Sequence, residues 1–202
     1  HERQFCYTNQ AFIKQVAKDA RDYFDGQPLK GEQIALGDYF AVVPLDNANW
    51  CQCEECSRQL AIDKDNIRGE HFNCGTATHY LWTFINNVAK EVKKTHPGKK
   101  IAALAYHVYA YLPEDIELED NISVAPCLHP RNYWAPKMKE NEADFYKDWI
   151  EESRKSHRPV YLWNYLCFPT ERGLVQGFNV FPGFSIHQVA AVSYTHLTLP
   201  TT

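Results

Sequence analysis

Short apolar runs alternate in this chain with segments whose apolar residues recur at helical spacing, and this alternation limits the fold more than any other feature. The runs at 41–43 and 101–106 carry no charged residue, which is typical of strands buried on both faces of a parallel sheet. Residues 77–92 repeat apolar side chains at i, i+3, i+4 and i+7, which predicts an amphipathic helix. Strands that alternate with helices indicate an α/β fold. Further strands are predicted at 5–8, 122–126 and 160–165, and further helices at 12–24, 141–150 and 182–192.

The sequence also narrows the kind of α/β fold. No glycine-rich phosphate turn follows a predicted strand, which disfavours a dinucleotide-binding fold. We therefore predict part of a (β/α)8 barrel of the TIM type, with about five strands. The chain starts at His1, and residues 193–202 resemble a translated sequencing adapter. We expect residues 1–192 to be a fragment of one barrel domain, truncated at both ends, and residues 193–202 to be a non-native tail.

The composition is that of an ordinary globular domain and argues against several kinds of partner. Of the 202 residues, 45% are hydrophobic, which is enough for a sizeable core, and the net charge is −4. A mildly acidic chain lacks the basic face that phosphate groups require, so we expect no nucleic-acid partner. No apolar run approaches transmembrane length, so we expect no membrane span. The oligomeric state stays open.

Three cysteines, Cys51, Cys53 and Cys56, lie within six residues and predict a metal site. Three thiolates and a fourth ligand form a tetrahedral structural zinc site, for which Cys74 is the first choice of fourth ligand and His71 the second. A disulfide between two of these thiols is the alternative, favoured if the protein is exported. A catalytic metal ranks third. The other cysteines lie in or beside apolar strands and are interpreted as small buried hydrophobic residues: Cys6, Cys127 and Cys167.

Reactive side chains in such barrels lie just beyond the carboxyl ends of the strands. Asp46 follows the run at 41–43 and His107 follows the run at 101–106, so we predict both to be catalytic, as carboxylate and as proton carrier. Asp46 could instead form an Asx turn, and a histidine at a strand end is as often structural. Glycosidic cleavage normally needs two carboxyl groups, and no second acid is as well placed as Asp46.

The same rule nominates residues that would bind substrate. Aromatic side chains offer apolar faces to a sugar ring, and an arginine can pair with a uronate carboxylate, although core packing and surface ion pairs are the commoner roles of these residue types. The predicted substrate-binding residues are Asn47, Trp50, Tyr106, Tyr109, His129, Arg131, Asn164 and Tyr165.

Four stretches of this chain, at 46–56, 81–92, 104–106 and 120–122, resemble an uncharacterised bacterial family, the domain of unknown function 4838. The resemblance runs from about residue 5 to about residue 189, and its cysteine motif is its most specific part. Members of that family follow α-glucuronidase-like or hexosaminidase-like N-terminal domains and are regarded as glycoside-hydrolase-like. The resemblance implies a transglycosidase-type barrel and a secreted, periplasmic or cell-surface location, but it assigns no catalytic residues.

These observations lead to one preferred function and two alternatives. We expect a carbohydrate-active hydrolase that cleaves glycosidic bonds in an oligo- or polysaccharide, with uronic acids or amino sugars as candidates, by a carboxylate-based mechanism. The alternative is a non-catalytic glycan-binding barrel with a structural zinc site. A small zinc module that contacts protein or nucleic acid is the weakest hypothesis, because the strands indicate a large enzyme-like domain.

Overall fold

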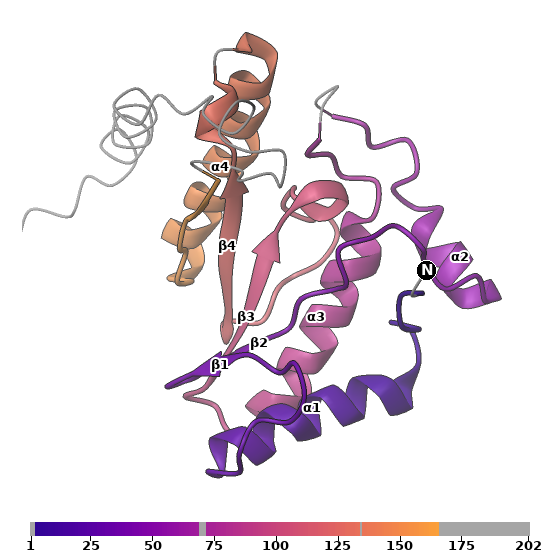
Figure 1. The fold of residues 1–202 in the computed structure, drawn as a ribbon, viewed down its shortest axis with the longest axis vertical. Coiled ribbons are helices and arrows are strands. Elements are labelled where there is room, and N and C mark those ends of the chain that lie inside the picture. Colours follow the sequence, from indigo (N-terminus) through magenta and orange to yellow (C-terminus); the bar gives the residue numbers. More distant parts are fainter. Residues whose placement is uncertain (1–2, 69–71, 134, 166–202) are drawn as a thin grey trace, which may run out of the picture.

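A five-stranded sheet forms the centre of the protein, whose computed structural model describes residues 3–68, 72–133 and 135–165. The strands follow one another across the sheet in chain order (Figure 1). β1 and β2 form an antiparallel hairpin, and β2, β3, β4 and β5 are parallel. The sheet is curled like half of a barrel. The strands are β1 Ala35–Leu36, β2 Tyr39–Ala41, β3 Lys100–Ala105, β4 Ile122–Leu128 and β5 Trp163–Asn164.

The connections between the parallel strands bring four loops to one edge of the sheet. The chain from β2 to β3 contains α2 (Glu54–Leu60) and α3 (Thr78–Lys93), and the chain from β4 to β5 contains α4 (Pro136–Ser156). The connection from β3 to β4 holds only the 3-10 turn His107–Tyr109. Because parallel strands all point the same way, the residues that follow β2, β3, β4 and β5 lie at a common edge, where α/β proteins build their sites.

Helices α3 and α4 cover the same face of the sheet. α3 packs on β3 and α4 on β4 (Figure 1), and the rings of Trp82 and Trp149 meet between the two helices at 4.8 Å. Ile101, Ala103 and Ala105 of β3 are buried, whereas the residues between them are half-buried. The apolar face that the sequence predicts for residues 77–92 therefore lies in the core, and the opposite face of the sheet is open enough to line a pocket.

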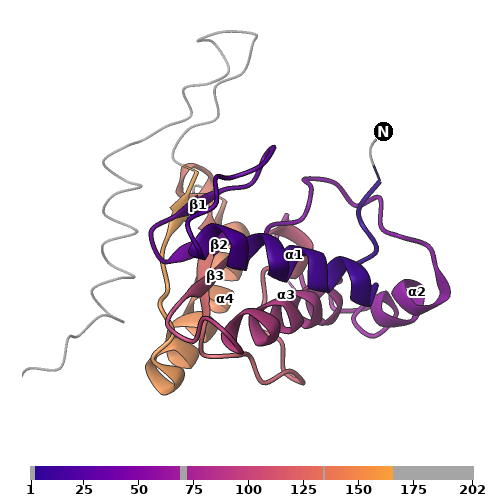
Figure 2. The ribbon, with the colours of Figure 1, turned by 90° about the horizontal axis from the view of Figure 1, so that it is seen from below.

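The first helix, α1 (Gln10–Phe24), packs along α3 rather than on the sheet (Figure 2). The side-chain oxygen of Asn9 accepts hydrogen bonds from the N–H groups of Ala11 and Phe12, which caps the free amides of the first turn. The segment before α1 enters the core through Tyr7, whose ring contacts Phe84 of α3 at 4.6 Å. The segment from Tyr7 to Asn9 is thus fixed against the main helix layer.

Several predictions about the elements are wrong in detail. Residues 5–8 form no strand, because Tyr7 packs into the helix layer instead of pairing with the sheet. The strand at 41–43 ends at Ala41, and Val43 is exposed. The short helix α2 was not predicted, because its one buried side chain is Cys56 and it therefore shows no apolar periodicity. α4 starts at Pro136, ahead of the predicted 141.

The fold class is α/β as predicted, and the described sheet is a curled half-barrel of five strands. The predicted helix at 182–192 and the tail at 193–202 lie outside the described residues. Among the helices of the described ranges, none combines the length and the apolar character that a membrane span requires.

Candidate functional site

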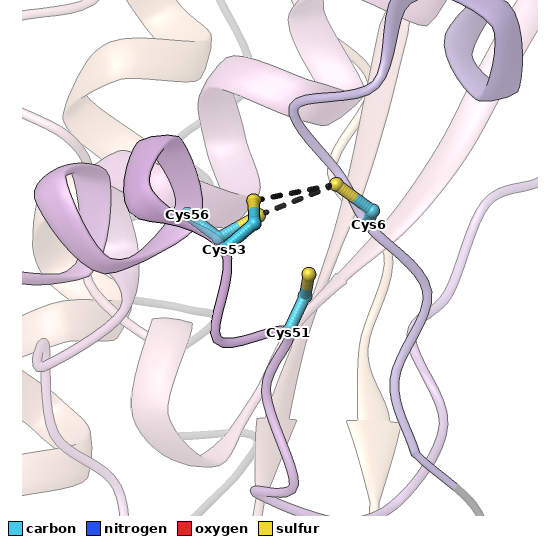
Figure 3. Close-up of side chains that lie close together, drawn as sticks. All are labelled: Cys6, Cys51, Cys53 and Cys56. Atoms are coloured by element: carbon cyan, nitrogen blue, oxygen red, sulfur yellow. Dashed lines mark hydrogen bonds between the residues drawn. The ribbon is translucent and has the colours of Figure 1, made fainter.

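Four cysteines gather at the side of the strand-end edge, and we call this group, Cys6, Cys51, Cys53 and Cys56, the thiol centre. Cys6 comes from the segment before α1, Cys51 from the loop after β2, Cys53 from the position that starts α2, and Cys56 from its first turn. All four sulfur atoms lie within 4.8 Å of one another (Figure 3). The Sγ of Cys6 is 3.8 Å from that of Cys53 and 3.6 Å from that of Cys56.

Two hydroxyl groups hydrogen bond the most deeply buried thiol of the centre. The Tyr80 hydroxyl of α3 donates to Cys56 Sγ at 3.1 Å, and the Thr8 hydroxyl lies 3.2 Å from the same sulfur. The pKa of the Cys53 thiol is lowered to about 7, because the backbone N–H and the thiol of Cys56 hydrogen bond its sulfur. The Cys53 N–H acts to lower the pKa of Cys51, but burial and the neighbouring thiols outweigh it and raise that pKa to about 12.

The donor set of the thiol centre fits a tetrahedral metal ion. A zinc–sulfur bond of about 2.3 Å places the sulfur atoms of a regular tetrahedron about 3.8 Å apart, close to the separations of Cys6 from Cys53 and Cys56. Four thiolates this close repel one another, so full ionisation requires a cation between them. The four cysteines are unpaired thiols. The centre is therefore compatible with a metal site.

The fourth cysteine of this group is Cys6, whereas Cys74, the predicted fourth ligand, does not belong to it. Cys74 lies beside the turn that follows β3. Its N–H donates to the carbonyl of His107, and its sulfur is 3.4 Å from the Thr76 hydroxyl. Cys6 was interpreted as a small buried hydrophobic residue, because sequence spacing does not reveal a partner 45 positions away. His71, the other predicted choice, lies outside the described residues.

A small cavity, the strand-end pocket, opens beside the thiol centre at the carboxyl ends of β2 and β3. Its volume is about 150 Å³. Seven predicted site residues line it. They are Asp46, Asn47, Trp50, Tyr106, His107, Tyr109 and Tyr165.

Asp46 is exposed at this pocket and takes no part in the local turn. The Asx turn of the loop is formed by Asn47, whose side-chain oxygen accepts a hydrogen bond from the Asn49 N–H at 2.9 Å. The Asp46 carboxylate forms no hydrogen bond or ion pair with another described residue. The structural role that competed with catalysis therefore belongs to its neighbour.

The charge of Asp46 affects the pKa of Tyr106 and of His107, the two residues that directly follow β3. Burial raises the pKa of Tyr106, and Asp46 adds to that effect, so the phenol remains a hydrogen-bond donor. Burial lowers the pKa of His107, while Asp46 acts in the opposite direction. His107 has a φ of 49°, a left-handed conformation that costs free energy in a residue other than glycine. Its N–H donates to the Asn73 side chain at 3.0 Å, and its ring stacks on Phe72 at 4.4 Å.

His129 lies behind the pocket wall rather than in the lining. It is 4% exposed, and its ring stacks on the pocket residue Tyr165 at 4.6 Å. Glu142 of α4, which is fully buried, accepts hydrogen bonds at 2.7 Å from both the N–H and the ring Nδ1–H of His129. Asn73 donates to the same carboxylate at 3.0 Å. Asn73 thereby links His129 to His107.

The remaining predicted binding residues contribute less. Asn164 is half-buried in β5 and is not part of the pocket lining. Arg131 lies in the 3-10 turn Pro130–Asn132, and its side chain is outside the described part of the structure. Glu142 and Asn73 were not predicted, because neither directly follows a strand.

Another residue that the sequence did not indicate is Gln4. Its side chain is 4% exposed and bonds the loop that carries Asp46. Gln4 Nε2 donates to the carbonyls of Leu45 at 2.5 Å and Asn47 at 2.7 Å, and Gln4 Oε1 accepts from the Leu45 N–H at 3.2 Å. An amide so close to the chain start carries no spacing signal that could have identified it.

Comparison with known proteins finds one match. The sequence model of a family described as "Domain of unknown function (DUF4838)" matches residues 1–172. No curated protein and no solved structure matches the chain.

Proposed function

The chain belongs to the DUF4838 family of domains of unknown function, and from its strand-end pocket we propose that it is a carbohydrate-active hydrolase. The substrate is an oligo- or polysaccharide, and the reaction is cleavage of a glycosidic bond. The observation that carries this proposal is an unpartnered carboxylate, Asp46, at the mouth of a pocket walled by Trp50, Tyr106 and Tyr165. Such rings can pack on the apolar face of a sugar while their polar atoms bind its hydroxyl groups.

The size of the pocket limits what it would hold. At about 150 Å³ it is smaller than cavities for drug-sized ligands, which measure about 300–1,000 Å³. It therefore suits a single sugar unit at the end of a chain. In this proposal Asn47 and Tyr106 bind hydroxyl groups, and Asp46 acts as acid, base or nucleophile.

The mechanism requires a second carboxyl group from outside the described lining, in which Asp46 is the one carboxylate. A full (β/α)8 barrel would supply it from another strand, and the four parallel strands with their curled sheet favour that architecture. A secreted, periplasmic or cell-surface location remains part of the proposal.

A non-catalytic glycan-binding domain is the second candidate, and the single carboxylate of the lining is the observation that favours it. Binding needs the rings and amides but no pair of acids. The two candidates differ in turnover and not in affinity.

A panel of 4-nitrophenyl glycosides, including the glucuronide and the N-acetylglucosaminide, separates these candidates in the intact protein. Hydrolysis of one member that falls at least about a hundredfold in Asp46→Asn supports the hydrolase, since this is the lower end for an acid–base group. Asp65→Asn, an exposed aspartate of another loop, is the matched control. Binding of the parent sugar without any hydrolysis would favour the glycan-binding domain.

For the thiol centre we propose zinc, held by Cys6, Cys51, Cys53 and Cys56 as a structural ion. Four thiolates leave no open coordination position, which suits a structural role rather than a catalytic one. Zinc would neutralise the clustered thiolates and join the segment before α1 to α2.

Elemental analysis of the intact protein tests the zinc proposal. We expect about one zinc per chain, lost in acid because the ligand thiols must be deprotonated. Cys6→Ser should weaken zinc binding more than about a hundredfold, since even partners outside the ligand set contribute about 10–100-fold. Cys74→Ser is the matched control and should bind as the parent does. Protein free of metal, with two of the four thiols oxidised, would instead support the disulfide.

A further inference from the structure

The loop that carries Asp46 has little regular structure of its own, so its position depends on contacts from elsewhere. We call residues 45–50 the pocket loop. Its internal hydrogen bonds are all short-range: Asn47 N–H to the Leu45 carbonyl at 2.8 Å, Trp50 N–H to the Ala48 carbonyl at 2.9 Å, and the Asx turn. These bonds shape the loop locally but do not fix where it lies relative to β3.

Gln4 supplies long-range hydrogen bonds to the pocket loop, in addition to the contact of the Trp50 ring with Tyr80 of α3 at 5.9 Å. Besides its three side-chain bonds to Leu45 and Asn47, its main-chain N–H donates to the Asn49 carbonyl at 3.0 Å. These partners lie on both sides of Asp46 in the chain. The Tyr7 hydroxyl donates to Gln4 Oε1 at 2.7 Å and holds the amide in orientation. A buried amide with all its bonds made allows one placement of the loop.

The segment that carries Gln4 is itself firmly held, so it can serve as a reference for the loop. Tyr7 is 4% exposed and packs against Phe84 and Tyr80 of α3. Asn9, two residues later, caps α1. The hydrogen bonds of Gln4 therefore connect the loop to a segment that is packed on the helix layer.

The thiol centre joins the same two segments a second time. Cys6 lies two residues after Gln4, and Cys51 lies two residues after Asn49. Figure 3 shows Cys6 on the segment before α1, facing Cys51, Cys53 and Cys56 on the segment after β2. A metal ion at this point closes the chain between residue 6 and residues 51–56 and removes much of the entropy that the loop would gain by detaching.

We propose that Gln4 is a positioning residue for Asp46 and Asn47, and that metal in the thiol centre locks Gln4 against the pocket loop. The inference rests on the zinc part of the proposed function and is independent of the glycosidase part. Without metal the thiols hold the two segments together only weakly, and the Gln4 contacts open more often. Metal occupancy thus controls how well the strand-end pocket is formed.

Hydrogen exchange of individual amides tests this without a substrate. The probes are the Gln4 and Leu45 amides, whose hydrogen bonds join the two segments. In the intact protein we expect Gln4→Met to speed exchange of the Leu45 amide by about tenfold or more, since one buried bond is lost. Amides of β3 and β4 should not change. Methionine fills a similar volume, so a role in packing alone would leave the exchange of Leu45 as it is.

Metal removal is the second arm of the experiment. Wild-type protein loaded with zinc and then stripped with EDTA should show faster exchange at Gln4 and Leu45, and added zinc should restore protection. Gln27→Met, an exposed glutamine after α1, is the matched control and should behave as wild type. If Gln4→Met fails to fold, Gln4→Asn replaces it, because its shorter side chain cannot reach both carbonyls.

Two results would overturn the inference. Unchanged exchange of Leu45 in the Gln4 variants shows that Gln4 does not position the loop. If elemental analysis shows bound zinc but EDTA does not change the exchange rates of the Gln4 and Leu45 amides, the metal does not lock the loop. A protein that binds no zinc removes the metal from both this inference and the proposed function, whereas absence of glycosidase activity touches only the latter.

Discussion

The loops at the strand-end edge are held in two different ways on the two sides of the pocket. On the β2 side, the pocket loop is fastened to the segment before α1 by the Gln4 amide and by four thiols, one of which is exposed. On the β4 side, the turns are fastened to α4 by a fully buried carboxylate, Glu142, and its bonds to His129 and Asn73.

If the thiol centre binds zinc as proposed, the two walls of the pocket differ in kind. The permanent wall is the side on which Glu142 holds His129 and Asn73, and the conditional wall is the pocket loop, whose attachment depends on the metal. Buried hydrogen bonds such as those of Glu142 persist in the folded chain, because leaving the buried groups unpaired costs free energy. Thiols attract one another only weakly, whereas a cation that binds several of them as thiolates holds their segments firmly together. Asp46 stands on the conditional wall and His107 on the permanent one.

Removal of Glu142 should produce the largest effect on the permanent wall. Glu142→Ala leaves the His129 N–H, its ring N–H and the Asn73 amide without their buried acceptor. Breaking a buried pair of this kind costs about 3–5 kcal/mol of folding free energy. Urea unfolding measures it, and Glu151→Ala, a solvent-exposed change on the same helix, should cost less than about 0.5 kcal/mol. A loss of folding free energy below about 1 kcal/mol would show that the Glu142 contacts contribute no more than an exposed ion pair does.

How far the sequence predicts this arrangement depends on the range of the contacts. Strong periodicity places α3 and β3 within about one residue of the predicted 77–92 and 101–106, because packing of a whole face determines them. Strand-end position correctly groups Asp46, His107 and Tyr165 around one cavity.

What the sequence does not reveal is set by contacts between distant residues. Cys6 and Gln4 act through partners 50 and 41 positions away, and no local pattern marks such pairs. Glu142 resembles any other acid of a charged helix until its burial is known. His129 shares the strand-end position of His107, yet its ring is bonded to Glu142 and stacked behind the lining residue Tyr165, so it does not itself line the pocket.

Asn73 connects the permanent wall to His107, so its removal should have an intermediate effect. Asn73→Ala deprives the buried Glu142 of one donor and the His107 N–H of its acceptor. An unsatisfied buried group costs about 1–3 kcal/mol, which chemical unfolding would detect. Asn132→Ala, in the turn after β4 and half-exposed, is the control. Parent-like stability in Asn73→Ala would separate His107 from the Glu142 network.

On the conditional wall, Tyr80 should tune the thiol centre without forming it. Tyr80→Phe removes the hydroxyl that donates to Cys56 Sγ but keeps the ring in the core. Loss of such an outer partner lowers metal affinity by about 10–100-fold, which competition with a zinc chelator measures. Tyr23→Phe, whose hydroxyl bonds the Gly37 carbonyl far from the thiols, should bind zinc as the parent does. Equal affinities in the two variants would mean that Cys56 is not a ligand.

The smallest expected effect is a change in the pKa of His107, which depends on Asp46 across the pocket. Burial lowers the pKa of His107 below the ordinary histidine value of about 6.5, and the Asp46 carboxylate partly offsets this. A lowered histidine pKa means that the unfolded chain binds the proton more readily than the folded one. The stability that His107 contributes is therefore complete above the ordinary value and is lost as the pH falls through the lowered pKa.

NMR of the imidazole nitrogens should accordingly place the midpoint of the His107 titration below the ordinary value. Asp46→Asn removes the opposing charge and should lower the midpoint further, whereas Asp65→Asn should leave it unchanged. Removal of zinc should act in the same direction as Asp46→Asn, because a released pocket loop carries Asp46 away from His107. If neither Asp46→Asn nor EDTA changes the midpoint, Asp46 does not lie beside His107, and the conditional wall has no part in the site.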